Sequence, residues 1–81
     1  ESIIFPNPTN GVFAIASEGL PNSTATITVI NVLGDVIFER NYATANSELE
    51  ATIDLSSQAA GLYFIQIVSG NVKDTGNLII E

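Results

Sequence analysis

Apolar side chains recur at every second position in several short stretches, and this alternation limits the fold more than any other feature of the sequence. Over residues 48–55, charged and hydroxyl side chains alternate with leucine, alanine and isoleucine, and over 24–29 threonine alternates with alanine, isoleucine and valine. This period of two is typical of a β-strand with one buried face. Isoleucine, valine and threonine, which pack well on a pleated surface, make up 24 of the 81 residues. The chain is therefore predicted to be all-β.

Turn-forming segments divide the chain into short strands. Loops are expected at residues 6–11 and 18–23, hairpin turns at 33–35 and 69–71, and a short helical turn at 56–60. The predicted strands cover residues 3–5, 12–16, 24–32, 36–42, 49–55, 62–68 and 74–80. Short strands at spacings of about ten residues indicate an antiparallel β-sandwich. Because 81 residues have room for one core, residues 1–81 are predicted to form a single domain.

The stretch 61–68 is apolar on both faces, which predicts a central strand that is covered on both sides. Tyr63 follows a corner at which Gly61 allows a sharp turn, and its hydroxyl is expected to bond to the chain a few residues upstream. Tyr42 is the one aromatic side chain expected at the surface. The phenylalanines assigned to the core are Phe5, Phe13 and Phe38.

The composition argues against several classes of function. Cysteine and histidine are absent, which removes disulfides, thiolate and imidazole metal ligands, and the usual nucleophile and base pairs of hydrolases. The net charge is −7 with Arg40 and Lys73 as the only cations, which argues against nucleic acid and anionic membranes as partners. No apolar run approaches about 18 residues, and the first residues do not resemble a signal peptide. We therefore expect a monomer with no enzymatic activity, cofactor or membrane insertion.

Three carboxylates, Glu48, Glu50 and Asp54, share the polar face of one predicted strand. Paired carboxylates can hydrolyse glycosides, and clustered oxygen ligands can bind Ca²⁺. No calcium-loop motif accompanies these residues, and nothing in the sequence would desolvate them. A solvated face that discourages edge-to-edge aggregation is the favoured interpretation, with weak Ca²⁺ binding as the alternative.

Four motifs resemble one known family. They are FPNPTNG at residues 5–11, ITVINVLGDVI at 27–37, IDLSS at 53–57 followed by AGLYFI at 60–65, and NLIIE at 77–81. Each motif is weak alone, but their order and spacing together are specific. Over essentially its whole length, the chain resembles the C-terminal sorting domain of the type IX (Por) secretion system of Bacteroidetes.

The resemblance implies an Ig-like β-sandwich that carries no catalytic site. It implies a position at the C-terminal end of a larger secreted protein, whose N-terminal cargo domains are exported through the periplasm and across the outer membrane of a Gram-negative bacterium. The implied partners are the outer-membrane translocon and a sortase. Two departures from the family pattern stand out: the tail is acidic at Asp74 and Glu81, with Lys73 as its one cation, and Asp35 replaces a common basic residue.

We expect the secretion machinery to recognise the shape of the domain and one strand edge. The last strand, 74–80, is predicted to be an edge strand that offers its main-chain groups, with Leu78 and Ile80 on one face and Ile79 on the other. For the prolines, the glycines, Asn7 and Tyr63, a purely structural role is the favoured alternative. The recognition candidates are Pro6, Asn7, Pro8, Gly11, Gly34, Gly61, Tyr63, Lys73, Leu78, Ile79 and Ile80.

A second class of function stays open from the sequence, namely an accessory carbohydrate-binding module or an Ig-like spacer of a secreted polysaccharide-degrading or adhesive protein. Carbohydrate-binding sandwiches usually expose a platform of aromatic side chains. The chain has no tryptophan and six aromatic residues in all, which makes this alternative the weaker one.

Overall fold

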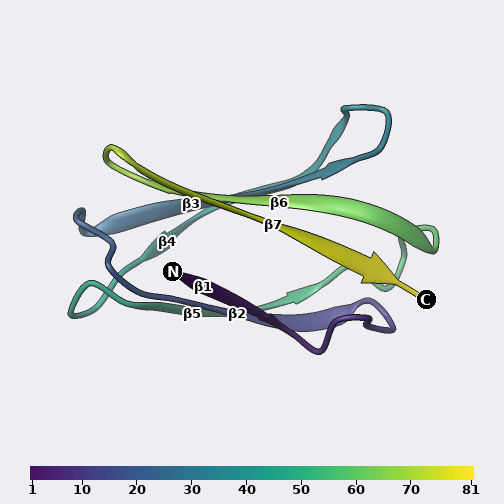
Figure 1. The fold of residues 1–81 in the computed structure, drawn as a ribbon, viewed down its shortest axis with the longest axis horizontal. Coiled ribbons are helices and arrows are strands. Elements are labelled where there is room, and N and C mark those ends of the chain that lie inside the picture. The colour runs from purple at the N-terminus through teal and green to yellow at the C-terminus, as the bar shows by residue number, and fades with distance from the viewer.

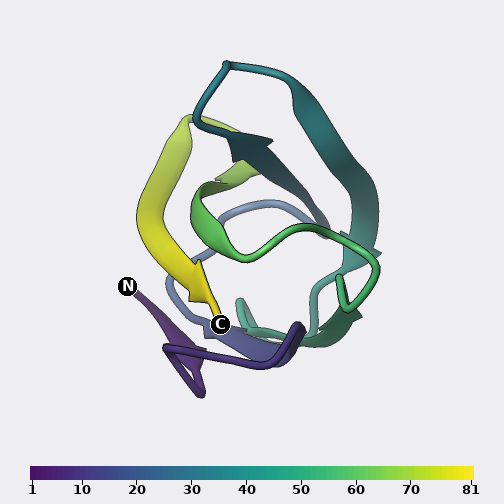
Figure 2. The same ribbon diagram turned by 90° about the vertical axis from the view of Figure 1, so that its right-hand side faces the viewer.

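Seven antiparallel strands form two sheets that pack face to face in the computed structural model, which describes all of residues 1–81. One sheet has three strands in the order β1–β2–β5, and the other has four in the order β4–β3–β6–β7 (Figures 1 and 2). The strands are β1 (Ser2–Phe5), β2 (Val12–Ser17), β3 (Thr24–Asn31), β4 (Val36–Ala43), β5 (Leu49–Asp54), β6 (Gly61–Ser69) and β7 (Val72–Ile80). The predicted all-β sandwich is confirmed, and the observed strand ends differ from the predicted ones by at most two residues. No helix in the structure is long and apolar enough to cross a membrane.

The core lies between the two sheets and is built from the inward-facing residue of each alternating pair. It contains 15 buried apolar residues. On β2, Phe13 and Ile15 point inward while their neighbours face outward, and Ile27 and Val29 do the same on β3. The alternation in the sequence therefore identifies the buried face of each strand correctly.

The central position of β6 is confirmed, because it pairs with β3 on one side and β7 on the other. The prediction that it is covered on both faces is wrong. Leu62 and Phe64 on its outward face are 39% and 40% exposed, because the two-layer fold leaves that face to solvent. Phe5 is also not a core residue, since it lies on the outward face of β1 and is 48% exposed.

The remaining aromatic side chains divide between the core and its margin. Phe13 is buried, and Phe38 is half-buried against the core. Tyr42 is half-buried as well, so its predicted surface position is corrected, and its hydroxyl is enclosed without a hydrogen-bond partner. The predicted tyrosine corner is confirmed, because the Tyr63 hydroxyl donates to the carbonyl oxygen of Ala59, four residues upstream.

Two of the predicted turns carry specific hydrogen bonds. In the β3–β4 hairpin, the side-chain oxygen of Asn31 accepts bonds from the N–H groups of Leu33 and Asp35, each at 3.0 Å. The segment 56–60 forms no helical turn. The N–H of Gln58 instead donates to the carbonyl of Leu55 at 2.9 Å, which closes a single tight turn before β6.

Candidate functional site

The loop between β1 and β2 lies against the outer edge of β7 and is bonded to it. The Asn7 side chain donates through Nδ2 to the carbonyl of Asn77 at 2.7 Å and accepts through Oδ1 from the N–H of Ile79 at 3.0 Å. Two main-chain bonds continue this pairing, from Thr9 N–H to the Ile79 carbonyl at 2.9 Å and from Glu81 N–H to the Thr9 carbonyl at 2.8 Å. We call this set of four bonds the Asn7 clamp. It joins two segments that are about 70 residues apart in the sequence.

The clamp changes the prediction made for the last strand. β7 is an edge strand, as expected, and Leu78 and Ile80 face the core while Ile79 faces outward. However, the clamp already occupies the outward main-chain groups from Asn77 to Glu81. An open ladder along the whole of 74–80 is therefore not available to a receptor. Because Leu78 and Ile80 are buried, only Ile79 among these three candidates can touch a partner of the folded domain.

The β1–β2 loop is also held in place by the close approach of Gly11 to the backbone of Ser56. A Cβ atom at this position would lie 2.6 Å from the Cα of Ser56, and its φ of +119° is one that other residues rarely adopt. The Gly11 carbonyl also accepts a bond from the N–H of Leu55 at 2.7 Å. Pro6 and Pro8 are exposed within the same loop, each after a cis peptide bond. The structural role expected for this motif is thus visible in its contacts.

The structure brings most of the recognition candidates to one end of the sandwich. Gly61 is paired with Ile80 at this end, and the β3–β4 hairpin that contains Gly34 lies there too (Figure 1). Lys73 is the exception: it is paired with Val68 beside the β6–β7 turn, at the other end, and is exposed. We call the end that holds the chain's C-terminus the motif end.

An exposed apolar surface covers the outward face of the four-stranded sheet at the motif end. It crosses all four strands, because Ile79 is opposite Leu62, Phe64 is opposite Ile30, and Ile30 is opposite Val36. Their exposed fractions are 45% for Ile79, 40% for Phe64 and 57% for Val36. We call these five residues the apolar patch. In the sequence, the apolar character of residues 61–68 signals this patch, although the same pattern led to the wrong prediction that both faces of the strand are covered.

The apolar patch continues onto the β3–β4 hairpin, where Val32 is 65% and Leu33 is 83% exposed. Toward the other end of the same face, the cross-strand row is polar, with Thr75, Gln66, Thr28 and Glu39 side by side. The contiguous apolar surface of this face therefore lies at the end where the family motifs gather, and Val68, beyond the polar row, is 37% exposed between Thr26 and Lys73.

Comparison with known protein families identifies the family of this domain. Residues 3–81 match the family of secretion system C-terminal sorting domains. The chain is a member of that family. The sorting domain is a C-terminal signal for type IX secretion, and it directs export across the outer membrane to the cell surface or the medium. A search of curated proteins found no match.

The sorting domain works with the type IX machinery and with cargo at its N-terminal side in the same chain. Domains of this kind are generally not enzymes. The structure does not gather Glu48, Glu50 and Asp54: Glu48 lies just before β5, and Asp54 on β5 is four residues beyond Glu50, about 13 Å away in an extended strand.

Two aspartates of the sorting domain are held by serine hydroxyl groups. The Ser56 hydroxyl and N–H both donate to Asp54, and these bonds lower the pKa of that carboxyl, the hydroxyl contributing most. The Ser2 hydroxyl donates to Asp74 Oδ2 at 2.7 Å and is the main reason why the pKa of Asp74 is lowered. Both carboxylates support local structure.

Proposed function

We propose that residues 1–81 form a single non-catalytic sorting module at the C-terminal end of a larger secreted chain, and that the outer-membrane translocon recognises the folded module through the apolar patch. The observation that carries the proposal is the exposure of Phe64 and Ile79 beside the family motifs. Contiguous apolar patches on a protein surface often mark sites of interaction with a partner. Aromatic and aliphatic side chains of this kind form the energetic centre of many protein interfaces.

Recognition through the patch also accounts for the role of the motif residues. Asn7 and Gly11 are engaged in the clamp, and Tyr63 is engaged in its corner. These residues fix the shape of the motif end, while the apolar side chains beside them remain free to contact a partner. A sortase that separates the module from its cargo is a further proposed partner.

The structure offers little support for carbohydrate binding. The two exposed phenylalanines, Phe5 and Phe64, lie on the outward faces of different sheets, so they cannot form one platform for a sugar ring.

A secretion assay with a matched pair of variants tests the proposal. Residues 1–81 are fused to a reporter that carries its own inner-membrane export signal, in a bacterium with a type IX system. Phe64→Thr combined with Ile79→Thr is expected to reduce the reporter in the medium at least severalfold and to leave it in the periplasm. Val68→Thr is the control, since Val68 lies on the same face of β6 at the opposite end and is 37% exposed.

Export of the Phe64→Thr/Ile79→Thr fusion at the level of the unsubstituted fusion would contradict recognition through the patch. Failure of the unsubstituted fusion would contradict the proposal that residues 1–81 act as a sorting module. The size of the secreted reporter tests the sortase, because processing releases it without the module. Deletion of residues 74–81 is a poorer test: it removes Leu78 and Ile80 from the core, so lost export could reflect unfolding.

A further inference from the structure

The outward face of the three-stranded sheet carries a groove that runs along β2. Of the side chains that β2 presents there, Ala14 and Ala16 end at Cβ, and Val12 lies beyond them at the start of the strand. Ile3 lies beside Ala16 on β1, and Glu50 lies beside it on β5. Because the middle row is short and both flanking rows are longer, the face is hollowed between them. Two adjoining hollows of about 540 and 280 Å³ follow this line and share Glu50 as a lining residue.

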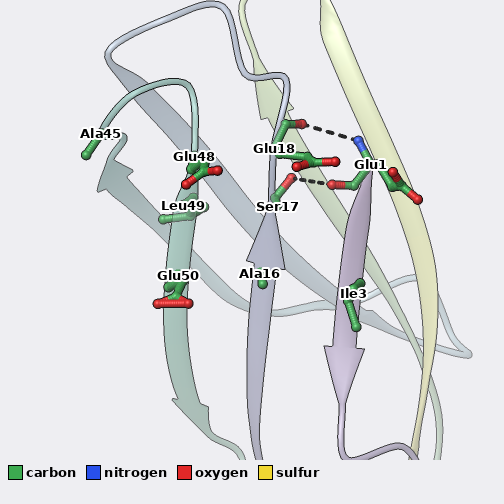
Figure 3. Close-up of a pocket in the computed structure, with 9 residues that line it drawn as sticks. All are labelled: Glu1, Ile3, Ala16, Ser17, Glu18, Ala45, Glu48, Leu49 and Glu50. Carbon is green, nitrogen blue, oxygen red and sulfur yellow. Dashed lines mark hydrogen bonds between the residues drawn. The ribbon is translucent and has the colours of Figure 1, made fainter.

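The two walls of the groove differ in chemistry, as Figure 3 shows for its upper part. On the β1 side, Ile3 is 60% and Phe5 is 48% exposed. On the β5 side, Glu48 and Glu50 are exposed, and Glu18 closes the end of the groove near them. We call the whole feature the β2 groove.

The carboxylates of the β2 groove have no cationic partner. Of the two basic side chains, Arg40 lies over the ring of Phe38 on the other sheet, and Lys73 is on β7. With a net charge of −7, the domain attracts cations, and this attraction is concentrated where unpaired carboxylates line a hollow.

From this geometry we propose that the β2 groove binds an extended polypeptide segment in which basic and apolar side chains alternate. Side chains of an extended chain point alternately to opposite sides and repeat about every 6.4–6.8 Å on each side. Ile3 and Phe5 have this spacing on β1, and on the other wall Glu50 lies on β5 with Glu48 two residues before it, just ahead of the first residue of that strand. A backbone lying over Ala14 and Ala16 would direct its basic side chains to the carboxylates and its apolar side chains to Ile3 and Phe5.

The proposal is independent of recognition through the apolar patch, because the groove and the patch lie on the outward faces of different sheets. Charge complementarity selects the partner: a segment that alternates acidic and apolar residues would meet the same apolar wall but would be repelled by Glu18, Glu48 and Glu50.

Nuclear magnetic resonance titration of the ¹⁵N-labelled domain tests the proposal. The probe is a six-residue peptide, acetylated and amidated, in which lysine and valine alternate. Two further peptides serve as comparisons: one of the same composition with the three lysines in a block, and one with glutamate in place of lysine. Shift changes are expected at amides of β1, β2 and β5 with the alternating basic peptide, weaker changes with the block peptide, and none with the acidic one.

Variants separate the groove from general charge attraction. Glu48→Gln with Glu50→Gln should weaken binding about threefold to tenfold, since exposed ion pairs each contribute modestly. Asp35→Asn with Glu81→Gln changes the net charge equally but lies outside the groove, and should leave binding nearly unchanged. Ala16→Leu should fill the groove and abolish binding, whereas Ala43→Leu on β4 should not.

Equal weakening by the two charge-neutralising pairs would overturn the proposal, because it would show binding to net charge alone. Shift changes centred on the four-stranded sheet, equal affinity for the alternating and block peptides, or full binding by a folded Ala16→Leu domain would overturn it too. The amide spectrum of each free variant shows whether it is folded.

Discussion

Replacement of Asn7 by alanine removes the two side-chain bonds of the clamp, and its cost can be worked out from the structure. The lost bonds are to the Asn77 carbonyl at 2.7 Å and from the Ile79 N–H at 3.0 Å. A neutral hydrogen bond contributes about 0.5–1.5 kcal/mol net, and water can replace part of both bonds because Asn7 is exposed. We expect Asn7→Ala to lower the free energy of unfolding by about 1–2 kcal/mol. For a domain of this size, that corresponds to a melting temperature lower by about 5–15 °C.

Urea denaturation followed by far-ultraviolet circular dichroism measures this loss, and hydrogen exchange locates it. Ile79 N–H should exchange faster in the variant, whereas the amides of β3 should change only as far as global stability does. Asn10→Ala is the control, because Asn10 lies in the same loop and makes one local bond, to the N–H of Val12 at 3.2 Å. If Asn7→Ala costs no more than Asn10→Ala and Ile79 keeps its protection, the clamp does not hold the loop on β7.

Three further predictions follow from single contacts. Gly11→Ala should destabilise the domain by about 3 kcal/mol or more in the same denaturation assay, because its Cβ would lie 2.6 Å from a backbone atom. Gly34→Ala is the control: Gly34 has a φ of +88° but open space around it, so the substitution should cost about 1–2 kcal/mol. Equal costs for the two variants would refute the argument from close approach. Tyr63→Phe should destabilise the domain by about 1 kcal/mol, because it removes the corner hydrogen bond. Tyr42→Phe should stabilise the domain by a similar amount, because it removes an enclosed hydroxyl that has no hydrogen-bond partner. A loss of stability in Tyr42→Phe would show that this hydroxyl does have a partner. Because the pKa of Asp74 is lowered in the folded state, its carboxylate contributes stability at pH values above the ordinary aspartate pKa, and this contribution is lost as the pH falls through the lowered pKa. The melting temperature should therefore decrease as the pH is lowered below about 4, and it should decrease less steeply in Asp74→Asn.

The strands could be predicted from the sequence because the signal for each of them is local. Alternation over 48–55 identifies β5 and its buried face, and the residues around Gly34 and Gly70 mark the hairpins that follow β3 and β6. The corner bond of Tyr63 was also predictable, since its acceptor is only four residues away. Each of these features depends on residues within one or two turns of chain.

The errors concern relations between distant parts of the chain. Alternation shows which residues share a face, but not whether another layer covers that face, so the exposure of Phe5 and Phe64 was missed. The Asn7 clamp joins residues about 70 positions apart through a side chain and a backbone, and no local pattern signals such a bond. The β2 groove likewise arises only when two alanines of one strand lie between longer side chains of its two neighbours.

The position of the clamp leads to a distinction that secretion assays can make. Asn7 and Gly11 act on the stability of the motif end, so their substitution should reduce export only to the extent that it unfolds the domain. Phe64 and Ile79 are exposed, so their replacement by threonine should reduce export while the melting temperature changes little. If export is plotted against melting temperature, the clamp variants should follow a common curve and the patch variants should fall below it. A plot in which Asn7→Ala lies far below that curve would mean that the translocon contacts Asn7 directly, and the motif would then be both part of the fold and part of the signal.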